Sequence, residues 1–78
     1  MGYLNDALRY YDEAELHSQF PALYSNKAYV CIDLHQYKQA YAELQKSFAL
    51  HPEHTPSQEC LSVLKEKIWL QWQAKSNG

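Results

Sequence analysis

Glycine is nearly missing from the interior of this 78-residue sequence, because its two glycines, Gly2 and Gly78, stand next to the ends of the chain. No Asn-Gly or Asp-Gly pair lies between alternating residues, as a tight hairpin between two strands would need. A glycine loop that could cradle a phosphate group is missing as well. The lack of these glycine motifs argues against a β-hairpin fold and against a nucleotide-binding loop.

Arginine is almost as scarce, since Arg9 is the only one, and the formal net charge is −2. The charge is spread unevenly, because residues 1–34 sum to −3 and residues 35–78 sum to +1. Proteins that bind phosphate backbones present several cations on one face, and arginine makes the best forked contacts. The sequence therefore predicts no nucleic-acid partner, although its seven tyrosines could stack on bases.

Long apolar runs are lacking too. The longest covers residues 28–32, which is far too short to cross a bilayer. The first ten residues contain Asn5, Asp6 and Arg9 and do not have the apolar stretch of a secretory signal. We therefore expect no membrane association and a cytoplasmic location. With 46% hydrophobic and 21% charged residues, the composition is that of a folded globular chain.

Cysteine is limited to Cys31 and Cys60, which each stand among apolar residues at helical spacing. We expect two buried free thiols, as in a protein of the reducing cytosol. A single bridge between them is the alternative that the sequence leaves open.

Side chains that could support chemistry are few. His51, His54 and Cys60 come nearest to a metal-ligand cluster, but a structural zinc ion needs four nitrogen or sulfur ligands at tight spacing. Asp33 and His35 are close in sequence, yet no serine or cysteine is placed beside them as a nucleophile. We therefore predict no metal ion, no cofactor and no enzymatic activity.

What the sequence has in abundance is helical periodicity, with apolar residues recurring at steps of three and four. This pattern predicts an all-α fold and a single domain over residues 1–78. Four helices are expected at residues 4–16, 21–34, 37–50 and 55–74. Because the connections are short, neighbouring helices should run antiparallel.

Prolines mark the helix boundaries. Pro21 suits a first helical turn, and Pro52 ends the third helix, because the residue before a proline disfavours helix. Thr55 is a candidate N-cap before Pro56. At the turn near His35 a residue with positive φ is expected, and histidine is enriched in that conformation among residues other than glycine. We predict that His35 adopts it.

Apolar stripes predict the face that each helix buries. They comprise Leu4, Ala7, Leu8, Tyr11 and Ala14; Leu23, Ala28, Val30, Cys31 and Leu34; Tyr37, Ala40, Tyr41, Leu44, Ser47 and Phe48; and Leu61, Leu64 and Ile68. The charged residues of the first helix, Glu15 among them, should fall largely on its opposite side. Glu43 and Lys46 are expected to pair across one turn on the outside of the third helix.

The first and third helices are related by an internal repeat. A shift of 33 residues aligns four pairs of inward-facing positions: Leu4 with Tyr37, Ala7 with Ala40, Tyr11 with Leu44, and Ala14 with Ser47. Such self-similarity at a fixed period is typical of stacked helical hairpins. The two helices are therefore interpreted as the same element one repeat apart.

Residues 21–54 resemble a tetratricopeptide repeat, which is a 34-residue helix–turn–helix unit. The positions that correspond to those of the family pattern are Tyr24, Lys27, Ala28, Cys31, His35, Tyr37, Ala40, Leu44, Ser47 and Pro52. Asn26 also stands where the family favours asparagine. The sequence departs from the pattern in three places, because Lys27 replaces an apolar residue, Cys31 an aromatic one, and His35 a glycine.

The resemblance covers one complete repeat, the second helix of a preceding repeat, and a fourth helix that resembles a capping helix. About three repeats are normally needed to bury the apolar faces of such an array. The first helix lacks the partner that would cover it. Either the chain belongs to a longer array, or it pairs with another copy.

In tetratricopeptide arrays the first helix of each hairpin lines a concave groove that binds peptides or protein segments. The resemblance thus implies a groove surface formed by Ala22, Ser25, Asn26, Tyr29 and Asp33. Ordinary solvated residues are the alternative interpretation. Tyr29 is the expected anchor, since tyrosine offers a large contact area at a low cost in entropy. The implied function is binding of a partner protein, through a peptide or helix.

Two further features indicate self-association as the alternative function. Trp69 and Trp72 lie three residues apart near the end of the fourth helix, which is apolar nearly all round. A homodimer contact or a neighbouring domain could cover them, or one tryptophan could cap the core of the domain. Tyr10 raises the same question on the first helix, where it could lie over the gap left by the missing partner.

Overall fold

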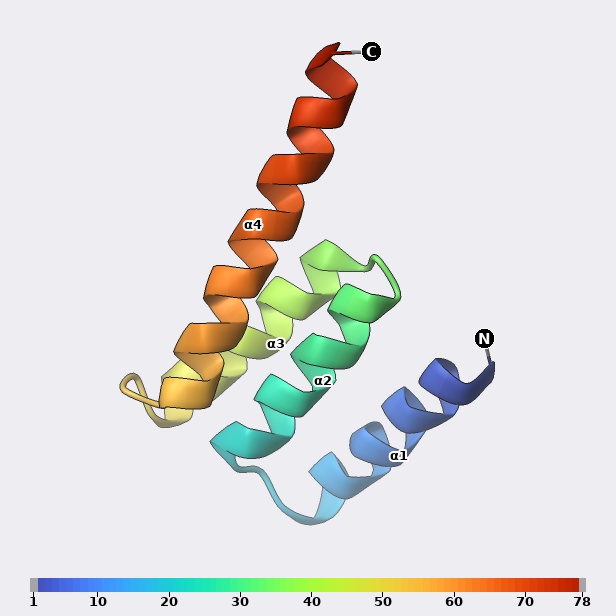
Figure 1. The fold of residues 1–78 in the computed structure, drawn as a ribbon. Coiled ribbons are helices and arrows are strands. Elements are labelled where there is room, and N and C mark those ends of the chain that lie inside the picture. The colour runs from blue at the N-terminus through green and yellow to red at the C-terminus, as the bar shows by residue number, and fades with distance from the viewer. Residues whose placement is uncertain (1, 78) are drawn as a thin grey trace.

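The fold was examined in a computed structural model that describes residues 2–77, with side chains described for residues 3–75. It consists of four helices: α1 (Gly2–His17), α2 (Pro21–Asp33), α3 (Tyr37–Leu50) and α4 (Thr55–Asn77). No strand occurs within the described residues, so the predicted all-α class is confirmed. Successive helices run antiparallel (Figure 1). The boundaries differ from the predicted ranges by three residues or fewer.

The turn between α2 and α3 is closed by two backbone hydrogen bonds. The His35 amide donates to the Ile32 carbonyl at 2.9 Å, and the Gln36 amide donates to the Cys31 carbonyl at 2.8 Å. This pair is the Schellman arrangement, which needs a left-handed residue just after the helix. His35 supplies it with a φ of 61°, as the sequence predicted.

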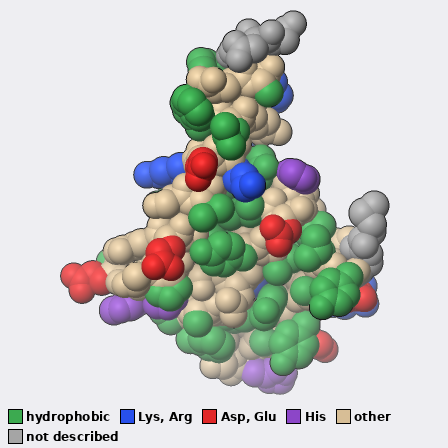
Figure 2. Space-filling view, in the orientation of Figure 1, with side chains coloured by type: hydrophobic (Ala, Val, Ile, Leu, Met, Phe, Trp, Pro, Cys, Tyr) green, Lys and Arg blue, Asp and Glu red, His purple; other side chains and the backbone are tan. Residues whose placement is uncertain are grey.

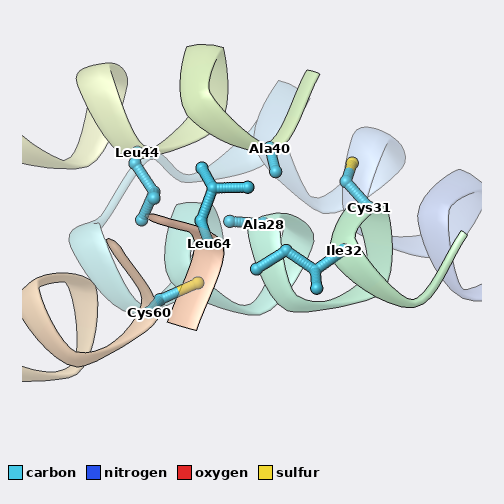
Figure 3. Packing of buried hydrophobic residues seen from close by; sticks show 7 residues of the cluster. All are labelled: Ala28, Cys31, Ile32, Ala40, Leu44, Cys60 and Leu64. Atoms are coloured by element: carbon cyan, nitrogen blue, oxygen red, sulfur yellow. The ribbon is translucent and has the colours of Figure 1, made fainter. Parts of the chain in front are cut away.

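The core gathers around α2, which packs against each of the other three helices. Figure 3 shows its centre, where side chains from α2, α3 and α4 meet. The cluster consists of Ala28, Cys31, Ile32, Ala40, Leu44, Cys60 and Leu64. The small side chains Ala28 and Ala40 are fully buried, so α2 and α3 approach closely. Cys31 and Cys60 are both buried and unbridged, which confirms the expectation of two free thiols.

A buried polar contact joins α3 to the start of α4. The hydroxyl groups of Ser47 and Ser57 are hydrogen-bonded to each other, and both residues are fully buried. His54 Nδ1 lies 2.7 Å from Ser57 Oγ as well. His54 therefore helps to position the first turn of α4, a role that the sequence did not indicate.

Two predicted core residues are exposed instead. Tyr41 on α3 is 51% exposed and Ile68 on α4 is 43% exposed. The reason for Ile68 is the length of α4, which has 23 residues against 13 in α2 and 14 in α3. At about 1.5 Å per residue, α4 is roughly 34 Å long and its neighbours roughly 20 Å. Its C-terminal part therefore projects beyond the rest of the molecule (Figure 1).

Within the described part of the chain, none of the helices has the length and apolar character needed to cross a membrane.

Candidate functional site

A buried ammonium group holds three helices together. Lys27 on α2 has a side chain that is only 5% exposed, and its Nζ lies 2.7 Å from Asp12 Oδ1 and 2.8 Å from Glu15 Oε1, both on α1. The same nitrogen lies 3.2 Å from Glu43 Oε2 on α3. A buried cation is tolerated only when it is paired and hydrogen-bonded. The three carboxylates meet that requirement.

The pKa values of this cluster follow from its geometry. Burial by itself lowers the pKa of the Lys27 ammonium group, but its hydrogen bonds to Asp12 and Glu15 and the charge of Glu43 raise it well above its ordinary value. The hydrogen bond from Lys27 lowers the pKa of Glu15, against the opposing effect of burial. Lys27 and Glu15 therefore both stay charged over the neutral range.

Further contacts complete the cluster. Tyr24 OH donates to Glu15 Oε2 at 3.0 Å, and Gln39 Nε2 donates to Glu43 Oε2 at 2.7 Å. Lys46 Nζ lies 3.7 Å from Glu15 Oε2 and 3.5 Å from Glu43 Oε1. It also lies 5.7 Å from the centroid of the Tyr24 ring. All three carboxylates converge on the buried Lys27 ammonium group, so the cluster serves to fix α1 and α3 against α2.

Two sequence predictions are corrected by this cluster. Glu15 points toward α2 and not to the outer side of α1, and Glu43 is 1% exposed although it was expected on the outside of α3. The Glu43–Lys46 pair exists, but Glu43 is drawn inward by Lys27. One signal was available in the sequence, because Lys27 occupies a position that is apolar in the repeat pattern. A lysine at a buried position requires acidic partners.

One face of α2 is open to solvent. Four of the five residues predicted to line a groove are exposed on it at helical spacing: Ala22, Asn26, Tyr29 and Asp33. Ser25 is the exception, because it is 3% exposed and its Oγ donates to the Ala22 carbonyl at 3.0 Å. Ser25 therefore offers no surface to a partner and does not belong to this face.

Tyr29 lies where the open face of α2 meets α4. Partial burial raises the pKa of its phenol group, and the negative charges that Cys60 and Glu59 of α4 acquire when ionised act in the same direction. The ring remains 38% exposed. Asp33 and Glu59 are exposed, whereas Lys27 is turned inward and paired. We call Ala22, Asn26, Tyr29, Asp33 and Glu59 the α2–α4 surface; it combines one aromatic ring with two carboxylates.

Large aromatic side chains are also exposed on α1 and α4. Tyr10 is 69% exposed, Trp69 55% and Trp72 62%. Neither tryptophan is buried in the core, so that alternative is excluded. Figure 2 shows hydrophobic side chains over α1 and over the projecting part of α4. Beside Tyr10, a shallow hollow of about 340 Å³ is lined by Tyr10, Glu13, Ala14 and His17 of α1.

The thiols are the remaining reactive groups. Burial raises the pKa of both Cys31 and Cys60 to about 11, which keeps them protonated and unreactive. Among the described residues, no group of three or more histidine, cysteine, aspartate or glutamate side chains is arranged to hold a metal ion.

No protein-family model, curated protein or solved structure matches this chain.

Proposed function

We propose that this chain is a protein–protein interaction module of the tetratricopeptide type, without catalytic activity, and that it binds a peptide or helix of a partner protein on the α2–α4 surface. The residue pattern of α2 and α3 supports the family assignment. So do the close approach of Ala28 and Ala40 and the left-handed turn residue His35. The single observation that carries the binding site is Tyr29, an exposed ring beside α4 with acidic neighbours.

The charge of this surface selects the chemistry of the partner. Asp33 and Glu59 are exposed there, and the lysine of α2 is paired with carboxylates of α1 and α3. A bound segment should therefore carry lysine or arginine next to an apolar or aromatic side chain that packs on the Tyr29 ring. Opposite charge across the surface speeds association and selects the partner, while the aromatic contact supplies most of the affinity.

A display library of random peptides tests this proposal with the purified chain as bait. We expect enrichment of peptides that combine basic residues with one aromatic or large apolar residue. The Tyr29→Ala substitution should weaken the selected peptides by about tenfold or more, as at a binding hot spot. Glu59→Lys should weaken them as well, and this loss should be largest at low ionic strength.

Tyr41→Ala is the matched control, because Tyr41 is also an exposed tyrosine and lies on α3, outside the α2–α4 surface. It should leave peptide affinity unchanged. Circular dichroism checks that each variant keeps its helix content. If the selected peptides bind the Tyr29→Ala and Glu59→Lys variants as tightly as the parent chain, the assignment of this surface is wrong.

A further inference from the structure

The outer face of α1 is open. Five residues follow this face at steps of three and four: Tyr3, Ala7, Tyr10, Ala14 and His17. The opposite side of α1 contacts α2 through Asp12 and Glu15. Among the described helices, α2 is the only one whose backbone lies close to α1, and α3 reaches α1 through the Lys46 side chain, which lies near Glu15. The open face therefore carries two exposed rings, Tyr3 and Tyr10, separated by the small side chain of Ala7.

The internal repeat shows what kind of contact this face is shaped for. A shift of 33 residues aligns Ala7 with Ala40 and Tyr10 with Glu43. On α3 both of these positions are fully buried, and Glu43 reaches Lys27 of the preceding helix. The open face of α1 therefore corresponds, one repeat earlier, to the face of α3 that packs against α2. A helix is the occupant that fits it.

The projecting part of α4 is such a helix with an uncovered apolar stripe. Ile68, Trp69 and Trp72 share one side of it, at spacings of one, three and four residues, and all three are exposed. Lys65 and Lys75 flank this stripe at the same side of the helix. Residues 65–75 contain three lysines and one glutamate, which sums to +2.

The two faces are complementary in charge as well as in apolar character. Of the four acidic residues in residues 3–17, Asp12 and Glu15 face Lys27 on the opposite side of α1 and Asp6 pairs with Arg9, which leaves Glu13 for the open face. Glu13 lines the hollow beside Tyr10. We propose that the projecting part of α4 from one copy of the chain packs on the open face of α1 of a second copy, with the Trp72 indole in the hollow beside Tyr10 and the lysines of α4 facing Glu13.

This contact is heterologous, because two different surfaces of the chain meet. In this contact α1 of one copy packs against α4 of the other copy, as helices within one chain pack against each other. A single helix–helix contact is smaller than a standard interface, so the association should be weak and concentration-dependent. It also leaves the α2–α4 surface free, and the inference does not depend on the proposed function.

Sedimentation velocity of the purified full chain tests the proposal, at concentrations from about 10 µM to about 1 mM, a range suited to weak complexes. The parent chain should associate increasingly with concentration and less at high salt. Tyr10→Lys or Trp72→Lys should each weaken the association by about tenfold or more. Both residues are exposed, so the fold should be kept, and circular dichroism verifies this.

Mixing the two variants gives the sharpest readout. The Tyr10→Lys chain keeps an intact α4 stripe, and the Trp72→Lys chain keeps an intact α1 face, so the mixture should form a 1:1 complex that neither variant forms alone. The matched controls Tyr41→Ala and Tyr29→Ala should associate like the parent chain. The proposal is overturned if the parent chain stays monomeric at all concentrations, if either lysine variant associates normally, or if the mixture contains no complex.

Discussion

Lys27 Nζ on α2 and Glu43 Oε2 on α3 lie 3.2 Å apart, and both side chains are almost completely buried. The pair joins two helices at a point where the repeat pattern places an apolar residue. Removal of one partner from such a pair leaves an uncompensated charge in the interior, which costs more than the pair itself contributes.

Lys27→Met should lower the free energy of unfolding by about 3–5 kcal/mol, because it removes the buried cation of the Glu43 carboxylate and leaves only the half-exposed Lys46 near it. Urea unfolding followed by circular dichroism measures the change. The double variant Lys27→Met with Glu43→Leu should recover most of the loss, since no buried charge then remains unpaired. Lys46→Met is the control; Lys46 is half-exposed and its removal should cost about 1 kcal/mol or less. Equal losses for Lys27→Met and Lys46→Met would contradict the structural role of this pair.

His35→Gly should raise the free energy of unfolding by about 0.5–1 kcal/mol. Relief of the left-handed backbone, which costs a residue with a Cβ about 1–2 kcal/mol, exceeds the entropy that glycine adds to the unfolded chain. His35→Val should have the opposite effect, because a β-branched residue tolerates positive φ poorly. Thermal unfolding of the three proteins provides the comparison, and a glycine variant less stable than the parent would show that the side-chain contact of His35 with Tyr37 outweighs backbone strain.

Cys31 and Cys60 should react slowly with a thiol reagent at pH 8 in the folded protein. A pKa of about 11, against 9.0 for an ordinary thiol, lowers the thiolate fraction by about 100-fold, and burial slows access further. Both thiols should react promptly in denaturing urea. Fast modification of either cysteine under native conditions would contradict their burial in the core.

Stability should fall at both ends of the pH range. In the folded state, the hydrogen bond from Lys27 lowers the pKa of Glu15. The stability that Glu15 contributes is therefore present above pH 4.5, which is its pKa in the unfolded chain, and is lost as pH falls. The pKa values of Lys27 and Tyr24 are raised, so their contributions are complete below about pH 10 and are lost as pH rises further. Urea midpoints measured across pH give the profile.

Glu15→Gln provides the control for the acid limb of that profile. This variant should be less stable than the parent at neutral pH and should lose less stability between neutral pH and pH 3. If the variant loses as much stability as the parent between neutral pH and pH 3, other carboxylates cause the loss of stability in acid.

The part of the α2–α4 surface that lies on α2 could be predicted, because the tetratricopeptide resemblance implies Asn26, Tyr29 and Asp33 and helical spacing places them on one face. The burial of Ser25 could not, since it depends on how other parts of the chain cover that side of α2. The contribution of Glu59 to this surface requires α4 to lie beside α2, which depends on the tertiary structure.

The sequence by itself determined the helices, their boundaries and the left-handed turn at His35. These features depend on contacts within a few residues, namely proline positions, periodicity and the closing hydrogen bonds of one turn. Only the tertiary structure decided that Lys27, Glu43 and Glu15 are turned inward and that Tyr41, Ile68 and both tryptophans are exposed. Periodicity specifies which residues share a face of a helix, but burial depends on where the neighbouring helices lie and how far they extend.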